Sequence, residues 1–216
     1  MTSSRRPTTR RPRRQLNRTA IVAEALRLVR AEGLAAVTMR RLAEELGTAP
    51  MSLYRHVEDR QALLIAMLDE VAQSVSRSVP PPVADPRSEI TAVLTAIHDA
   101  LRQDPWAVRL IVSQRLAGPS ILPLLERLFA ALGTAGLSPR DSMVAYGLLW
   151  QYTAGELLHT HPETTGNFAA EMTRAASPET YPALAAAMAA FAAGPPGDWF
   201  PENLQRLLDG LLHPRV

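Results

Sequence analysis

Apolar residues recur at helical spacing along most of the chain, and turn residues separate one block from the next. In the first block they share one face of a helix, at positions 21, 22, 25, 28 and 29. Asn17 precedes this block as an N-cap would, and Gly33 follows it as a C-terminal stop would. The block therefore predicts a helix over about 18–32. No window alternates between apolar and polar residues long enough to indicate a strand, so the pattern predicts an all-α protein of about nine helices.

Two short helices are predicted next. Thr38 can cap a helix that Gly47 ends after about two turns, and Pro50 suits the first turn of another helix. In that second short helix, Leu53 and Val57 lie four residues apart and can both face a core. The side chains at positions 52 and 54–56 would then face solvent.

The rest of the chain is predicted to form longer helices that proline and glycine separate. The fourth helix opens with Glu58 and Asp59, whose negative charge suits a helix N-terminus, and continues to about residue 78. A triple proline at 80–82 ends it, and Asp85-Pro86 starts the fifth helix. Later helices are predicted at about 105–116, 120–135, 139–160, 178–193 and 199–212. The least patterned segment, 162–177, is predicted to be a loop with room for one turn.

Residues 38–57 have the short helix, tight turn and short helix of a helix-turn-helix. In that module the second helix enters the major groove of DNA, and its exposed side chains meet the base edges. Arg40 and Arg55 can pair with phosphate or guanine, and Arg60 can contact phosphate near the start of the fourth helix. Shorter donors lie on the second helix of the pair, at Ser52, Tyr54 and His56. A solvated face on a small helical bundle has the same spacing, so the distribution of charge is needed to choose between the two.

Basic residues are concentrated at the beginning of the chain, although the formal net charge is only +2. Lysine is absent, and residues 1–16 carry six arginines without an acid. Residues 17–79 carry eight arginines and eight acids, and residues 80–216 carry nine arginines and thirteen acids. The Arg/Thr/Pro composition of the first sixteen residues predicts a disordered arm. Such an arm beside a helix-turn-helix can lie on phosphates or in the minor groove, and the alternative is a solubilising tail.

Part of the sequence resembles a known family. Three segments of this sequence resemble the DNA-binding domain of the TetR family of repressors. They are VTMRRLAEELG at 37–47, PMSLYRHV at 50–57 and LL at 63–64. The match is dense over residues 17–70. The resemblance implies an all-helical homodimer, in which an N-terminal reading head is joined to a larger domain that binds a small ligand and dimerises.

The resemblance also implies which side chains contact DNA. They are Thr38 and Arg40 at the start of the second helix, Pro50, Met51, Ser52, Tyr54 and His56 on the recognition helix, and Arg60 at the start of the fourth helix. One position departs from the family pattern, because the residue before Pro50 is often Ser or Thr and here is Ala49. Alanine cannot accept the cap hydrogen bond, and Thr48 is the nearest substitute.

The C-terminal part resembles the family only in outline. We expect an arm over 1–16, a DNA-binding domain over 17–62 and a ligand-binding and dimerisation domain over 63–216. Polar residues that interrupt apolar runs, with aromatic residues near them, can line a pocket for a small, mostly apolar ligand. The candidates are His98, Trp106, Gln114, Tyr146, Trp150, Glu156 and His159. For each of them a place in the core or in an interface is the simpler explanation, and a buried Glu156 would need a partner such as an arginine across the dimer.

Two helices are candidates for a dimer interface. Helix 139–160 is apolar nearly all round, which predicts core contacts on one face and a partner subunit on the other. Helix 199–212 carries a leucine stripe, and two helices from each subunit would form a four-helix interface. The candidate residues are Leu148, Tyr152, Leu204, Leu207, Leu208 and Leu211. The alternative is that the leucine stripe belongs to the core of one chain.

Several other classes of protein are disfavoured. The absence of cysteine excludes disulfides, thiolate nucleophiles and cysteine-based metal sites. No apolar segment follows the basic start, and the longest strongly apolar stretch, 143–158, is too short to cross a membrane, so a cytoplasmic protein is expected. Paired metal-binding histidines, phosphate-binding loops and nucleophile motifs are missing, so we expect no enzyme, cofactor or metal. The acid pairs at 44–45 and 69–70 are interpreted as solvated helix faces.

We therefore predict a transcriptional repressor that binds a palindromic operator in double-stranded DNA as a homodimer and that a small ligand releases. Two alternatives stay open. One is a helical DNA-binding regulator that a protein partner controls in place of a small ligand. The other is a helical enzyme or binding module with an incidental basic arm.

Overall fold

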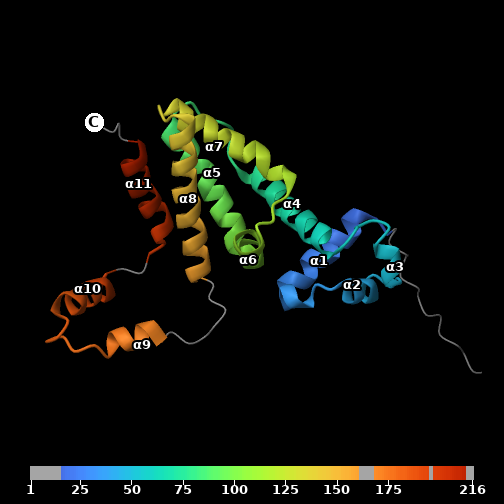
Figure 1. Cartoon of the computed structure of the whole chain (residues 1–216), viewed down its shortest axis with the longest axis horizontal. Helices are drawn as coiled ribbons and strands as arrows, with labels where there is room; N and C mark the ends of the chain where they lie inside the picture. Colours follow the sequence, from blue (N-terminus) through green and yellow to red (C-terminus); the bar gives the residue numbers. More distant parts are fainter. Residues whose placement is uncertain (1–15, 161–167, 195–196, 213–216) are drawn as a thin grey trace, which may run out of the picture.

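The computed structural model describes residues 16–160, 168–194 and 197–212. In these residues every regular element is helical, with eleven α-helices and two short 3₁₀ turns, so the predicted all-α fold is confirmed (Figure 1). A small head at one end consists of α1 (Arg18–Glu32), α2 (Met39–Glu45) and α3 (Pro50–Leu53). From this head α4 (Arg60–Ser78) runs into the body. The body consists of α5 (Pro86–Gln103), α6 (Pro105–Gln114), α7 (Leu122–Thr134), α8 (Pro139–Thr160) and α11 (Trp199–Leu212).

Two further helices lie apart from the body in Figure 1, namely α9 (Phe168–Arg174) and α10 (Pro182–Ala193). Although α10 is rich in apolar residues, none of them is buried. The two 3₁₀ turns are η1 (Leu34–Ala36), directly after α1, and η2 (Pro119–Ile121), directly before α7.

Side-chain caps fix the beginnings of several helices, and the sequence predicted two of them, Asn17 and Thr38. Asn17 Oδ1 accepts a hydrogen bond from the Ala20 N–H at 2.8 Å, and Thr38 Oγ1 accepts one from the Arg41 N–H at 3.1 Å. Asp59 caps α4 in the same way. Each cap satisfies an N–H group that has no partner inside the helix, and this selects the residue at which the helix begins.

The recognition helix is shorter than predicted, because α3 ends at Leu53 and not at His56. The N–H groups of His56 and Val57 both donate to the carbonyl of Leu53, at 2.9 and 3.0 Å, and close a turn there. Neither Ala49 nor Thr48 provides a side-chain cap for α3. An uncapped helix of one turn has little intrinsic stability, so packing must hold this segment in place.

Two boundaries near the end of the chain also differ from the prediction. The segment 162–177, predicted to be a loop, contains the seven-residue helix α9. Its composition of Ala, Glu, Met and Arg favours a helix even without an apolar stripe. Helix α10 begins at Pro182 and not at 178, because proline is well placed at the first helical position.

One apolar core runs from the head into the body. Leu53 and Val57 are buried, as predicted, and they belong to the same cluster as the buried residues of the body. Along α4, buried side chains extend from Leu63 to Val75. The head is therefore not an independent core, because α4 contributes to both parts.

A buried ion pair holds the proline-rich segment between α4 and α5. Glu89 Oε1 accepts a hydrogen bond from Arg127 Nε at 2.6 Å, and Glu89 Oε2 accepts one from the Val83 N–H at 3.0 Å. Arg127 also donates to the carbonyl of Pro80 at 3.0 Å. The hydrogen bond from Arg127 lowers the pKa of the Glu89 carboxyl, and burial opposes it with a smaller effect.

We expect this pair to make stability depend on pH. The folded-state pKa of Glu89 is lowered from its ordinary value of 4.5, so the pair contributes fully above that pH and its contribution is lost as the pH falls further. Glu89→Gln should lower the free energy of unfolding by about 3 kcal/mol at neutral pH, and this deficit should shrink in acid. Urea unfolding across the pH range measures it. A deficit that is independent of pH would contradict the prediction.

Among the described residues, no single helix combines the length and apolar character needed to cross a membrane. One pair of helices, Pro105–Gln114 and Pro119–Thr134, has the required length and apolar composition when the two are taken together, but they are bent by 100° relative to each other.

Candidate DNA interface and ligand cavity

The predicted DNA-contacting side chains are accessible on the surface of the head. Helices α2 and α3 pack against each other and turn their apolar side chains inward. Leu53 is fully buried, whereas Met51, two residues earlier, is 73% exposed. The exposed members of the predicted set are Thr38, Arg40, Pro50, Met51, Tyr54, Arg55, His56 and Arg60, and Ser52 is half-buried. The set is thus free to contact a macromolecule, and contact with DNA stays a prediction.

Two members of this set are held close together where α2 and α4 begin. Arg60 Nε donates a hydrogen bond to the carbonyl of Val37 at 3.3 Å, and Thr38 is the next residue along the chain. The Thr38 Oγ1 accepts a hydrogen bond from the α2 backbone, so its hydroxyl proton remains available to an acceptor. A cation and a hydroxyl donor at a helix N-terminus form an arrangement that suits phosphate.

Several acidic residues of the head form ion pairs with arginines of α1 and α2. Glu45 pairs with Arg27 at 3.2 Å and with Arg41 at 2.8 Å. Glu24 also contacts Arg27, and Glu32 also contacts Arg41. This network neutralises two arginines, Arg27 of α1 and Arg41 of α2.

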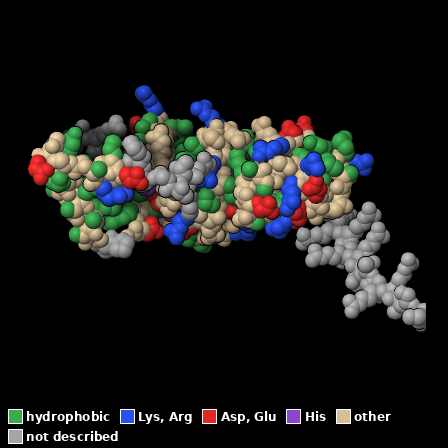
Figure 2. Space-filling view, turned by 90° about the horizontal axis from the view of Figure 1, so that it is seen from below, with side chains coloured by type: hydrophobic (Ala, Val, Ile, Leu, Met, Phe, Trp, Pro, Cys, Tyr) green, Lys and Arg blue, Asp and Glu red, His purple; other side chains and the backbone are tan. Residues whose placement is uncertain are grey.

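The remaining arginines of α2 and α3 are more accessible. Arg40 pairs with Glu44 at 3.1 Å, but both side chains are exposed, and such surface pairs are weak. Arg55 makes no ion pair with another described residue. On the face shown in Figure 2, basic and acidic side chains are mixed over the head and form no single basic patch. The head therefore offers separate cations and no continuous basic surface, which fits the equal numbers of arginines and acids over residues 17–79.

The body encloses an apolar cavity of about 160 Å³, which α4, α5, α6, α7 and α8 surround. Among its described lining residues, Tyr146 and Trp150 of α8 are the two with polar side-chain atoms. Neither the Tyr146 hydroxyl nor the Trp150 indole N–H has a hydrogen-bond partner among the described residues. Burial raises the pKa of Tyr146, so its phenol stays neutral. The cavity thus combines apolar walls with two polar groups that a ligand could satisfy.

Beside this cavity, α4 is in close contact with the loop before η2. A Cβ on Gly118 would lie 2.5 Å from the Cα of Asp69, so only glycine fits there. Asp69 accepts hydrogen bonds from the Ser120 N–H at 2.7 Å and from Gln73 at 3.1 Å. Burial alone would raise the pKa of Asp69, but these hydrogen bonds outweigh it and lower the pKa. The interpretation of the acid pair at 69–70 as a solvated helix face is therefore wrong for Asp69.

We expect Gly118→Ala to destabilise the body. The added methyl group would overlap the backbone of α4, and overpacking of this kind costs about 1–3 kcal/mol. Gly133→Ala is the matched control, because no atom lies within 4 Å of the place that its Cβ would occupy. In that helix the control should be neutral or stabilising by up to about 1 kcal/mol. Thermal unfolding compares the two, and equal melting temperatures would contradict the contact.

Comparison with known proteins covers nearly the whole chain. Residues 21–67 match the model of the tetR family of bacterial regulatory proteins, and residues 81–214 match the model of the tetracyclin repressor-like C-terminal domain. The chain belongs to the TetR family. It is a DNA-binding transcriptional regulator, and the resemblance found over residues 17–70 is confirmed and extended to the body.

Individual relatives support this membership. The transcriptional repressor DrrR1 of Streptomyces coeruleorubidus is 32% identical, over 97% of this chain and 82% of its own length. The structure of ActR from Streptomyces coelicolor in complex with actinorhodin has a TM-score of 0.74 and 29% identity, and covers 92% of this chain and 98% of ActR. BioQ with its double-stranded DNA operator has a TM-score of 0.64 and 25% identity, and covers 92% of this chain and 99% of BioQ.

The structure of this TetR family member divides the predicted ligand residues among several places. Tyr146 and Trp150 line the apolar cavity. Trp106 and Gln114 line a separate cleft of about 550 Å³ between α1, η1 and α6. His159 is exposed near the end of α8. The seven candidates therefore do not line one pocket.

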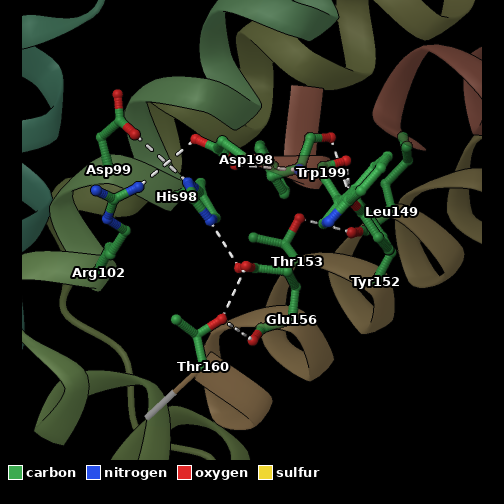
Figure 3. Close-up of polar contacts among 11 residues, drawn as sticks. His98, Asp99, Arg102, Leu149, Tyr152, Thr153, Glu156, Thr160, Asp198 and Trp199 are labelled. Atoms are coloured by element: carbon green, nitrogen blue, oxygen red, sulfur yellow. Dashed lines mark hydrogen bonds and ion pairs between the residues drawn. The ribbon is translucent and has the colours of Figure 1, made fainter. Parts of the chain in front are cut away.

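The last two candidates, His98 and Glu156, bind each other at the base of α11 (Figure 3). His98 Nε2 lies 2.7 Å from Glu156 Oε2, and the His98 ring stacks on Phe200 with 3.7 Å between ring centroids. Phe200 stacks in turn on Tyr152, whose hydroxyl donates to the Phe200 carbonyl at 3.2 Å. The partner of Glu156 is thus in the same chain, where Thr160 also donates to it. This cluster fixes α11 to α5 and α8.

The predicted dimer residues also fall into two groups. Leu204 and Leu208 are fully buried inside the chain, so their assignment to a dimer interface is wrong. They pack toward α5 and α8, the helices that α11 contacts. Leu148 is 44% exposed, and Leu207, Leu211 and Tyr152 are partly exposed. These four stay candidates for contact with a partner subunit.

Sequence reasoning missed several residues that join the helices of the body. Gly118 was visible only as part of a Gly-Pro break, and nothing local indicates that Asp69 lies against it. Phe200 is buried at the start of α11, but its stacking partner is about a hundred residues away in sequence. Such contacts depend on tertiary structure and have no periodic signal in the sequence.

Proposed function

We propose that this regulator is a homodimeric repressor that leaves a palindromic operator when a small, mostly apolar ligand enters the cavity beside α4. One observation carries the proposal: α4 lines the cavity with Leu68, Val71, Ala72 and Val75, and the same helix begins at Arg60 in the head. A ligand that displaces α4 would therefore change the position of the head. The names of DrrR1, ActR with actinorhodin and BioQ with its operator support this reading. The repressor would act in the cytoplasm, where chromosomal DNA lies.

The lining of the cavity favours a neutral ligand. Among the described residues no charged side chain lines it, so a charged ligand would lose its hydration without gaining a partner there. Tyr146 and Trp150 could donate hydrogen bonds to carbonyl or phenol oxygens of the ligand. A volume of 160 Å³ is smaller than the roughly 300–1,000 Å³ of typical ligand pockets. A drug-sized ligand would therefore push the walls apart, and this displacement is what α4 would transmit.

The dimer is proposed to form through α8 and α11. Their outer faces combine exposed apolar side chains with small residues, which suits close packing of helices from two subunits. The apolar positions are Val144, Leu148, Leu207 and Leu211. Open space surrounds the place of a Cβ at three glycines of the two helices, which are Gly147, Gly155 and Gly210.

On DNA, the two heads of such a dimer would occupy successive major grooves, about 34 Å apart. The Arg-rich arm of residues 1–16 lies outside the described residues except for Leu16, and its proposed role is electrostatic attachment to phosphates. We keep the division into a DNA-binding domain over 17–62 and a ligand-binding and dimerisation domain over 63–216 as part of the proposal.

The decisive experiment combines DNA footprinting with a ligand screen. The wild-type chain should protect a two-fold symmetric site in the DNA upstream of its own gene. Neutral aromatic compounds should then be screened for a rise in melting temperature, and a hit should also abolish the footprint. A chain that protects no DNA would overturn the repressor. Compounds that bind the cavity and leave the footprint unchanged would overturn ligand control and favour regulation by a protein partner.

A further inference from the structure

Asp104 occupies the corner between α5 and α6, and its carboxylate receives three hydrogen bonds. Arg30 donates two of them, from Nε to Oδ1 and from Nη2 to Oδ2, both at 2.8 Å. Trp106 Nε1 donates the third, to Oδ1 at 2.9 Å. The backbone of Asp104 ends α5 and begins α6, so the position of the carboxylate is fixed by both helices.

The donor of the paired hydrogen bonds comes from the head. Arg30 lies in the last turn of α1, 74 residues before Asp104 in sequence. The ion pair therefore joins α1 directly to the body, in addition to the covalent connection through α4. A two-point contact between guanidinium and carboxylate restricts the angle as well as the distance between its partners. It thereby restricts the orientation of the head.

The acceptor side of the same contact is next to the cavity. Leu101, three residues before Asp104 on α5, lines the cavity, and so does Ile111 on α6. A ligand that displaces either helix would move the corner between them and the carboxylate with it. The contact is therefore placed to sense both the shape of the cavity and the angle of the head.

The two partners differ in how easily they can separate. The side chain of Asp104 is 6% exposed, whereas that of Arg30 is 56% exposed. Arg30 can turn into solvent at little cost, but the carboxylate that it leaves would remain buried with Trp106 as its remaining donor. Separation of the pair would therefore be a movement of Arg30 away from a carboxylate that stays buried.

We propose that Arg30, Asp104 and Trp106 form a lock that couples the orientation of the head to the shape of the cavity. This inference rests on the proposed function of the chain as a ligand-released repressor. It adds a second route of coupling through α1 and the corner between α5 and α6. Arg30 and Asp104 act as positioning residues, because neither is expected to contact the operator or the ligand.

The test uses Trp106 as a reporter in the full-length chain. The three tryptophans are replaced by 5-fluorotryptophan, and the ¹⁹F signal of Trp106 is assigned as the one missing from Trp106→Phe. The DNA probe is a duplex that the wild-type chain selects from random sequences. Binding of this duplex should shift the Trp106 signal in the wild-type chain, because the lock rearranges when the head is held on DNA.

Arg30→Gln should remove that shift and weaken binding to the duplex about tenfold, because the head is no longer held at one angle. Arg27→Gln is the matched control: it lies on the same helix, but its ion pairs stay inside the head. It should keep the shift and change the affinity by less than about twofold. Asp104→Asn removes the acceptor charge of the same ion pair and should reproduce the effects of Arg30→Gln. Agreement between the two variants would show that the effects do not come from misfolding of one of them.

The outcomes separate the lock from the proposed function. If the wild-type chain selects no duplex, the repressor and the lock both fail. If it binds a duplex and the Trp106 signal does not move, the lock alone is overturned. Equal shifts in Arg30→Gln and Arg27→Gln would also overturn the lock and leave the repressor standing.

Discussion

Replacing both Tyr54 and His56 with alanine is expected to abolish operator binding while leaving the fold intact. Both side chains are exposed on the surface of the head, so their removal creates no cavity. Each contact with a base or phosphate contributes about 1–3 kcal/mol. The loss of two should therefore weaken binding roughly 30-fold to 20,000-fold. Electrophoretic mobility shift with the operator identified by footprinting measures this loss.

Tyr181→Ala provides a matched control for this variant. Tyr181 is also an exposed tyrosine, but it lies directly before α10, far along the chain from the head. It should bind the operator like the wild-type chain. If the Tyr54 and His56 variant binds equally well, α3 and the turn after it do not read DNA, and the assignment of the recognition surface is wrong.

Leu148→Arg is expected to convert the proposed dimer to a monomer. The outer face of α8 would present a charge to the partner helix, and burying that charge without a partner is unfavourable. A monomer binds one half-site, so it loses the gain that comes from linking two binding events, and operator affinity should fall by about 100-fold or more. Light scattering after size-exclusion chromatography should give a mass of 23.6 kDa in place of twice that value.

The control for this prediction is Val112→Arg on α6. Val112 and Leu148 are both 44% exposed, so the two substitutions place the same charge at equally accessible positions. Val112→Arg should remain dimeric. A dimeric Leu148→Arg variant would show that the subunits meet through a different surface.

The parts of the fold that sequence predicted well are those that local chemistry determines. The beginning of α1 follows from Asn17, and the beginning of α4 follows from Asp59, because each cap bonds an N–H group three residues later. The end of α3 could not be predicted in this way. Its helical spacing continues to His56, but the chain turns after Leu53, and packing of Leu53 and Val57 decides where the helix ends.

The candidate sites divide along the same line. The exposed side chains of α2 and α3 could be identified because a dense run of sequence carries them. The cavity could not, because its lining comes from five helices and from the segment before α7. The sequence pattern also indicates His98 and Glu156 as ligand residues, although they bind each other. The leucine stripe of α11 shows the remaining difficulty. A periodic pattern indicates that a face is buried, but it does not indicate whether the same chain or a second copy buries it.

The shared helix α4 has a consequence for engineering hybrid regulators. The proposed division after residue 62 falls within its first turn, close to Arg60, which bonds the head through Val37. A graft that exchanged residues 17–62 for those of a relative would keep the rest of α4. The apolar side chains of α4 would then have to pack against a head with a different sequence. To give this regulator a new DNA specificity, the head should therefore be exchanged together with the first part of α4. The part of α4 that lines the cavity should be retained.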